Sequence, residues 1–187
     1  IHPTYIQSML KDKRYSDEDL ISVIEYLKKE GGKSFRTDTL ETARQFFSGK
    51  AEGDWNPKKV FDGKSVLIIG PGPSTKKYKK SIESFIRKKS PHVIGLNTVD
   101  NIDQSLIGYR ASCHPVRLMA DTKRHLNFPQ PLITPFSLLS ADLKEVLKNK
   151  TTLNYGLTIE KDNFQFNNTD CVIPNPLVFS YILAMLN

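Results

Sequence analysis

Cysteine, tryptophan and long apolar runs are scarce in this sequence of 187 residues. The two cysteines, Cys113 and Cys171, have no C-x-x-C partner, so neither a disulfide framework nor a zinc knuckle is expected. Each is interpreted as a plain buried thiol. No apolar run reaches the roughly 18 residues of a membrane span, and the N-terminus lacks the basic start and apolar stretch of a signal peptide. We therefore expect a cytoplasmic protein without a membrane partner.

Metal-binding patterns are also lacking. The four histidines, His2, His92, His114 and His125, are scattered, and neither H-x-H nor H-E-x-x-H occurs. No metal site is therefore expected in this chain. Apolar residues make up 39% and charged residues 25%, which is the composition of a globular protein with a folded core.

Positive charge is in excess, with 27 Lys and Arg against 20 Asp and Glu, a formal net charge of +7. Much of the excess lies between Gly72 and His92, where Glu83 is the single acidic residue. Nucleic-acid surfaces usually interleave aromatic and basic residues over several elements, so nucleic acid is not the expected partner. Two interpretations stay open: a solvated helix face, or an attraction for a phosphorylated small molecule. The basic residues are Lys76, Lys77, Lys79, Lys80, Arg87, Lys88 and Lys89.

Three parts can be distinguished along the chain. Residues 1–50 have helical periodicity, with Ser16 as the cap of the clearest helix. Residues 51–64 combine glycine, proline and charge without a period and are interpreted as a linker, which Trp55 and Phe61 should anchor. Residues 65–187 form the main domain. Because the chain begins without methionine and stops inside an apolar helix, we expect a fragment of a longer polypeptide, truncated at its C-terminus.

The main domain alternates strands and helices. Strands are predicted at residues 65–69, 92–96, 106–113, 131–134 and 152–158, and helices at residues 76–89, 115–125, 141–148 and 176–186. The first strand is a nearly continuous β-branched run, as in a strand buried on both faces. Such alternation predicts an α/β fold with a three-layer, largely parallel, Rossmann-like sheet, preceded by the small helical segment.

The turn after the first strand, residues 70–74, reads Gly-Pro-Gly-Pro-Ser. A buried strand that ends in a tight turn before a helix presents unpaired N–H groups and the positive end of the helix dipole, so an anion fits there. Gly70 and Gly72 are expected to take positive φ and to allow close approach of a ligand, while Pro71 and Pro73 stiffen the turn. Ser74 offers a cap and a hydroxyl. The alternative is simple chain reversal.

Two known phosphate loops do not fit. The dinucleotide fingerprint G-x-G-x-x-G needs a third glycine where this chain has Thr75, and the second strand ends in Asn97 instead of the acid that binds ribose. Gly63, Lys64 and Ser65 imitate the end of a P-loop, but they precede the strand.

Three further positions are candidates, because ligands of open α/β sheets lie beyond the carboxyl ends of the strands. Asn97 could contact a base or ribose, or could only form a turn. His114 follows a later strand and could bind phosphate or act as acid or base, or could be purely structural. Asn175, between Pro174 and Pro176, starts the last helix and could bind an anion or sugar, or could only mark the helix start.

The segment VLIIGPGPS at residues 66–74, followed by a helix and a strand that ends in Asn97, resembles the opening of the MptE-like proteins, which include 6-hydroxymethylpterin diphosphokinases. It also resembles the GNGPS opening of bacterial sialyltransferases that use CMP-sialic acid. The second resemblance implies that Gly70, Gly72, Ser74 and Asn97 touch nucleotide, and that the turn at residues 174–176 touches base or sugar. Pro71 stands where that family has Asn.

The segment IHPTYIQSMLKDKRYSDEDLISVIEYLKK at residues 1–29 is similar to the part that follows the barrel in DRE-TIM aldolases such as 4-hydroxy-2-oxovalerate aldolase. Aldolase-like proteins of bacterial surface-polysaccharide gene clusters carry a GPGPS-type domain after that barrel. The resemblance implies an upstream barrel of the same parent chain that holds a divalent metal and the lyase chemistry. His2 lies near the position of a catalytic tyrosine in that family.

Three functional hypotheses follow. The leading one is a domain that binds a nucleotide or nucleotide-sugar at the C-terminal end of an aldolase-like protein, with a small phosphorylated ligand at residues 70–74, Asn97 and Asn175. The second is a transferase in its own right, glycosyl or diphosphoryl, with His114 as the base. The third is a non-catalytic interaction module.

Overall fold

The structure, a computed structural model, describes residues 49, 52–114, 117–118, 121–139 and 141–187. The helical segment predicted for residues 1–50 therefore lies, Gly49 apart, outside the described residues, and so does His2.

The centre of the fold is a five-stranded parallel sheet, which confirms the predicted α/β, Rossmann-like fold. Its strands lie side by side in the order in which they occur along the chain. In dinucleotide-binding folds the strand order reverses and the ligand lies at the reversal. The five described strands have no such reversal. They are β1 (Val66–Ile69), β2 (His92–Leu96), β3 (Tyr109–Ala111), β4 (Leu132–Thr134) and β5 (Thr152–Asn154).

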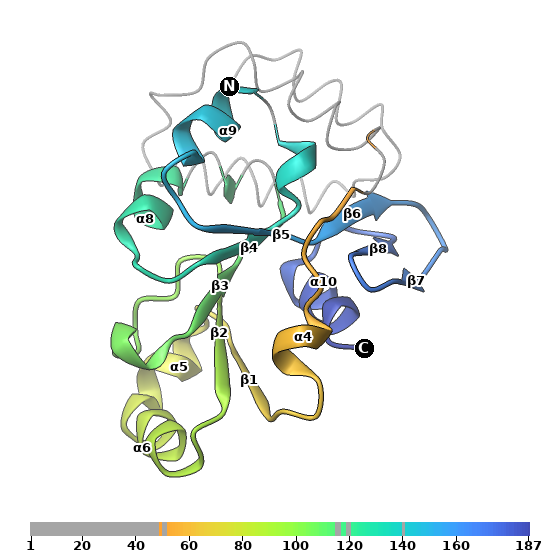
Figure 1. Cartoon of the computed structure of the whole chain (residues 1–187). Helices are drawn as coiled ribbons and strands as arrows, with labels where there is room; N and C mark the ends of the chain where they lie inside the picture. The colour runs from red at the N-terminus through yellow and green to blue at the C-terminus, as the bar shows by residue number, and fades with distance from the viewer. Residues whose placement is uncertain (1–48, 50–51, 115–116, 119–120, 140) are drawn as a thin grey trace.

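The strand order decides which face the connecting helices cover. Crossovers between parallel strands are right-handed, so strands that are added always on the same side place their helices on one face. Figure 1 shows these helices together on that face, and α4, α10 and a second sheet on the other. The first group is α5 (Pro73–Lys77), α6 (Lys79–Lys89), α8 (Thr122–Asn127) and α9 (Ala141–Leu147). Short 3₁₀ turns, η1 (Gln104–Leu106) and η2 (Phe136–Leu138), lie in the connections after β2 and β4. The opposite layer has α4 (Lys58–Phe61) and α10 (Val178–Met185).

The second sheet was not predicted. It contains β6 (Gly156–Ile159), β7 (Gln165–Phe166) and β8 (Asp170–Ile173) in the order β6-β8-β7, with β8 parallel to β6 and antiparallel to β7. The strand predicted at residues 152–158 is therefore two strands, β5 and β6, that belong to different sheets. Tyr155 lies between them, fully buried, and its hydroxyl is 2.9 Å from the carbonyl oxygen of Asp170.

Other boundaries differ less. The strand predicted at residues 106–113 is only β3, because η1 occupies the start of that range. The helix predicted from residue 76 begins at Pro73, since a proline suits the first helical position, and it breaks at Tyr78 between α5 and α6. β1 is not buried on both faces as expected: Val66, Leu67 and Ile68 are half-buried, because β2 is the single neighbour of β1 in the described sheet.

Residues 52–64 pack against the sheets. The backbone N–H groups of Asp54 and Trp55 donate to the carbonyl oxygen of Asn154 at 3.1 and 3.2 Å. The Trp55 ring lies edge-on to Phe61, whose ring in turn contacts Tyr109 with centroids 5.1 Å apart. The predicted anchoring by Trp55 and Phe61 is confirmed, and the segment supplies α4. In the described part of the chain, no helix has the length and apolarity that crossing a membrane requires.

A test of this packing is Gly53→Ala. An added Cβ would lie 1.8 Å from the carbonyl oxygen of Thr169 and 2.6 Å from the nitrogen of Gly156, both backbone atoms that cannot move aside cheaply. We expect a loss of about 1–3 kcal/mol or more in the free energy of unfolding, measured by urea denaturation. Gly108→Ala is the control, since its Cβ would meet only the carbonyl oxygen of Val93 at 3.6 Å. Equal stability of the two variants would contradict the packing.

Candidate functional site

Most of the predicted site residues lie at one edge of the molecule. The strands of the main sheet are parallel, so their carboxyl ends share an edge, where residues 70–74 follow β1 and Asn97 follows β2. His114 comes three residues after the end of β3. The thiol of Cys113 donates to the carbonyl oxygen of Pro176 at 3.3 Å, which brings the turn with Asn175 to the end of β3.

The loop of residues 70–74 is closed by Thr75. Its hydroxyl donates to the carbonyl oxygen of Gly70 at 2.8 Å, and its N–H donates to that of Gly72 at 3.1 Å. Gly72 is extended, with φ −65° and ψ 158°, and Pro73 begins α5. The expected positive φ of Gly70 and Gly72 is wrong, because Gly63 is the single glycine with positive φ among the described residues.

Packing does not require these two glycines either. A Cβ added at Gly70 would meet nothing within 4 Å, and one at Gly72 would meet only the Ser74 hydroxyl oxygen at 3.9 Å. At Gly95, by contrast, a Cβ would lie 2.8 Å from Val99. Neither a positive φ nor internal packing therefore requires glycine at positions 70 and 72.

The loop has few hydrogen-bond donors. Pro71 and Pro73 carry no N–H group, and the Thr75 N–H is already used within the loop. Within the described part of the chain, the N–H groups of Gly72 and Ser74 have no protein acceptor, and Ser74 is exposed. Two N–H groups and one hydroxyl are therefore left for a ligand, fewer than a P-loop supplies.

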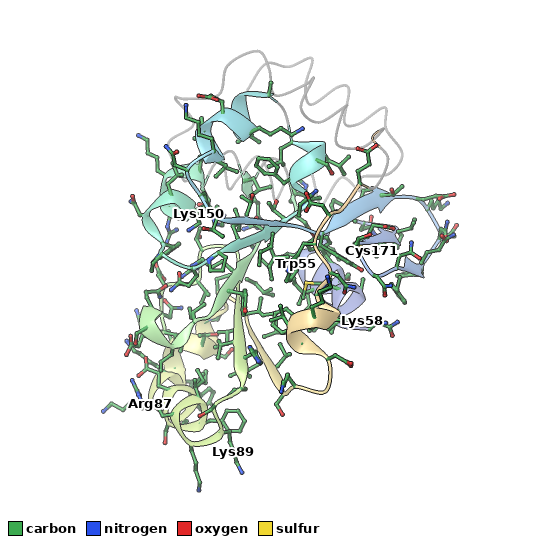
Figure 2. The ribbon with its side chains drawn as sticks, in the orientation of Figure 1. Trp55, Lys58, Arg87, Lys89, Lys150 and Cys171 are labelled. Carbon is green, nitrogen blue, oxygen red and sulfur yellow. The ribbon has the colours of Figure 1, made fainter. Side chains whose placement is uncertain are left out.

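The basic residues behind the loop are spread along α6. A helix rises about 1.5 Å per residue, so Lys88 and Lys89 lie a helix length away from the loop. Figure 2 shows Arg87 and Lys89 at the far end of α6, beside the start of β2. Arg87 is paired with Asp103 at 3.1 Å and with Glu83 at 3.7 Å. Among the residues of this group, Lys76 and Lys77 in α5 are next to the loop.

Asn97 forms the turn after β2. It has a left-handed backbone, φ 50°, and it is 9% exposed. Its side-chain oxygen accepts a hydrogen bond from the Ser112 hydroxyl at 3.2 Å, and its N–H donates to the carbonyl oxygen of Ala111 at 2.7 Å. The positive φ favours the turn-forming interpretation of Asn97. Its place at the strand end stays compatible with ligand contact.

Arg110, in β3, is hydrogen-bonded to the turn that Asn97 forms. The guanidinium is fully buried and donates to the carbonyl oxygen of Asn97 at 3.1 Å and to that of Val99 at 2.9 Å. Two carbonyls of one turn are thus bound by one rigid fork, which fixes the direction of the chain as it leaves β2.

The other groups that contact the Arg110 guanidinium are also uncharged. It donates to the side-chain oxygens of Gln130, at 3.1 Å, and Gln104, and it stacks 3.4 Å from the centre of the Phe128 ring. Burial, and then the charge of Arg124, lower the pKa of Arg110 to about 10, so it stays protonated at neutral pH. Sequence reasoning missed Arg110, although an arginine within a short strand among apolar residues is itself a signal of a buried polar network.

His114 is half-buried, and its carbonyl oxygen accepts from the Leu118 N–H at 3.0 Å. Its predicted catalytic role stays a prediction. Nearby, the buried Asp121 carboxylate faces the Thr98 hydroxyl at 3.5 Å. Asp121 and Thr98 were not predicted from the sequence, because neither belongs to a recognisable pattern.

Among the described residues no three His, Cys, Asp or Glu side chains are grouped to hold a metal ion. Cys113 and Cys171 are buried free thiols, as predicted, and burial raises the pKa of both, that of Cys171 to about 12, so neither is a ready nucleophile.

Comparison of the sequence with protein families, with curated proteins and with solved structures finds no match.

His125, in α8, yields a pH prediction. It is 1% exposed, and burial together with the charges of Arg110, Lys150 and Arg124 lowers its pKa from 6.5 to about 4. In the unfolded chain His125 therefore takes up a proton below about pH 6.5, whereas in the folded protein it does so only below about pH 4. Because the unfolded state binds more protons between these values, the free energy of unfolding falls as the pH falls from 6.5 to 4. We expect a loss of about 2 kcal/mol between pH 7 and pH 5 from this residue.

Urea denaturation of the wild type and of His125→Leu at both pH values measures this effect. Leucine has a similar size and does not titrate, so the variant should lose clearly less stability on acidification. Parallel losses in the two proteins would show that His125 does not carry the effect.

Proposed function

We propose that this protein binds a small phosphorylated ligand, a nucleotide or nucleotide-sugar, at the carboxyl edge of its main sheet. The observation that carries the proposal is the pair Gly70 and Gly72, for which the chain itself has no need of glycine. Glycine at such positions lets a ligand approach the backbone, and the Gly72 and Ser74 N–H groups are available beside it.

The ligand would lie across the strand ends. Its phosphate takes the N–H groups of Gly72 and Ser74 and the Ser74 hydroxyl, with Lys76 and Lys77 close enough to add attraction. Its sugar or base reaches towards Asn97 and towards the turn of Asn175, which the hydrogen bond from Cys113 to Pro176 holds nearby. Because the loop offers few donors, we expect modest affinity for phosphate alone.

The parent protein is proposed from residues 1–29, which lie outside the described residues. Their similarity to the segment after an aldolase barrel supports a C-terminal binding domain of an aldolase-like protein, with function in surface polysaccharide biosynthesis. The divalent metal and the lyase chemistry would then belong to the barrel. A cytoplasmic location fits a nucleotide-sugar ligand.

A transferase in its own right is the second candidate. It is favoured by the position of His114 at the same edge as the loop and next to the turn at residues 174–176. His114 would then take the proton of the acceptor hydroxyl. Turnover of a nucleotide-sugar or of a diphosphate donor by this chain, abolished in His114→Ala, would favour this candidate over binding alone.

Isothermal titration calorimetry with CMP, CDP, ATP and a CMP-sugar tests the proposal. We expect at least one of them to bind the wild type, and Gly72→Val to weaken that binding about tenfold or more, because the branched side chain fills the space of the phosphate. Gly108→Val, a glycine at the opposite ends of the strands, is the control and should bind like the wild type.

Thermal denaturation separates this effect from misfolding. Gly72→Ala has space for its Cβ and an ordinary φ, so its free energy of unfolding should stay the same or rise by up to about 1 kcal/mol. If no nucleotide binds the wild type, or if Gly72→Val binds as well as the wild type, the proposal is wrong.

A further inference from the structure

The edge of the main sheet at β1 has an unusual sequence. Among the described strands β1 is the outermost, and its sequence, Val-Leu-Ile-Ile, is apolar throughout, as in strands that have neighbours on both sides. Edge strands are usually protected by charge, proline or a bulge, and Val66–Ile69 carries none of these.

The hydrogen-bonding groups at this edge can be assigned. The N–H of His92 donates to the carbonyl oxygen of Ser65, so Ser65 faces β2. In a parallel ladder alternate residues face the same neighbour, and Leu67 and Ile69 therefore also face β2. Val66 and Ile68 present their N–H and C=O groups to the outside.

Two aromatic side chains, Phe85 in α6 and Tyr78 between α5 and α6, lie on the side of this layer nearest the same edge. Glu83 and Arg87 point towards η1, since Glu83 accepts from the Asp103 N–H at 2.8 Å and Arg87 pairs with the Asp103 carboxylate. Phe85 lies midway between them in sequence, roughly 200° around the helix from each, and therefore points away from the inner strands. Phe85 is 49% exposed, and Tyr78, two helical turns earlier, is 52% exposed.

The charge at this edge is positive. Lys89 shares the flank of Phe85, Lys77 lies 5.1 Å from the centre of the Tyr78 ring, and Lys64 precedes β1. From Gly63 to Ser90 the sequence has eight basic residues and one acid, Glu83, which is already paired with Arg87. Two copies of β1 paired antiparallel would bring the Lys64 and Lys89 end of one copy against the Lys76 and Lys77 end of the other. Such repulsion disfavours a second copy of this chain.

We propose that the open edge of β1 is a docking site for an extended, acidic protein segment that adds a sixth strand. The segment hydrogen-bonds to Val66 and Ile68, buries apolar side chains against Phe85 and Tyr78, and carries acidic residues at its ends that meet the lysines. This interaction needs no ligand at the carboxyl edge, because its hydrogen bonds use the backbone of β1, while Lys77 lies near both sites.

Fluorescence anisotropy with labelled peptides tests the proposal. The probe is DEVIVVED, an apolar run between acidic ends, and the comparison peptides are KKVIVVKK, with basic ends, and DEVIPVED, whose proline interrupts strand pairing. We expect the acidic probe to bind at least about tenfold more tightly than either of the others, and to weaken as salt is raised. Equal binding of all three, or no binding of DEVIVVED at about 1 mM, would overturn the proposal.

Variants locate the binding. Phe85→Ser should weaken the acidic probe about tenfold, and Lys89→Glu should weaken it and strengthen KKVIVVKK. Val146→Ser removes an equally exposed apolar side chain from α9, beyond the inner strands, and should change nothing. All three positions are exposed, so the variants should fold. An effect of Val146→Ser equal to that of Phe85→Ser would contradict the assignment.

Hydrogen exchange gives the decisive readout. On addition of DEVIVVED, the amides of Val66 and Ile68 should exchange about tenfold more slowly, while that of Leu67, already bonded to β2, changes little. Unchanged Val66 and Ile68 amides in the presence of bound peptide, or concentration-dependent self-association of the free protein, would refute strand addition. The nucleotide titration above is unaffected by either outcome.

Discussion

The right-handed crossover of parallel strands, applied always in the same direction, is the constraint on which this structure depends. Because β1 to β5 lie in chain order, their connecting helices share one face, and the carboxyl ends of all five strands share one edge. The same order leaves β1 with a single neighbour in the described sheet. The candidate ligand site and the open edge therefore meet at one strand, β1 and the loop that follows it.

Arg110 supplies the second constraint. A buried cation is costly unless its donors are all used, and this one satisfies backbone carbonyls of Asn97 and Val99 together with two glutamine side chains. None of these acceptors carries a charge, so the positive charge of Arg110 is not neutralised by its own hydrogen bonds. It is bonded to the turn of Asn97, at the same edge of the sheet as the proposed phosphate site in residues 70–74, so its charge adds to the attraction for an anion at that edge.

The sequence predicts the parts of the fold whose signals are local. The range of β2 is predicted without error, and β4 and α9 within one residue, because apolar runs between turn residues are strong signals. The second sheet could not be predicted: β7 has two residues, and its surroundings are rich in Asn and Asp. The hydrogen bonds of Arg110 reach residues up to twenty positions away, and its partners Gln104 and Gln130 are bonded to each other across 26 positions, so the network leaves no local pattern. At the loop, the positive φ predicted for Gly70 and Gly72 is wrong, and the close approach of a ligand predicted for the same residues stays a prediction.

The central claim is that the backbone of the loop at residues 70–74 receives a phosphate. A ¹H–¹⁵N correlation spectrum of the labelled protein, titrated with CDP, tests it most directly, because each amide reports its own environment. The account predicts the largest shift changes at the amides of Gly72 and Ser74, whose N–H groups lack a protein acceptor in the described chain, with smaller changes at Asn97. Changes confined to Lys88 and Lys89, or no changes at all, would contradict it.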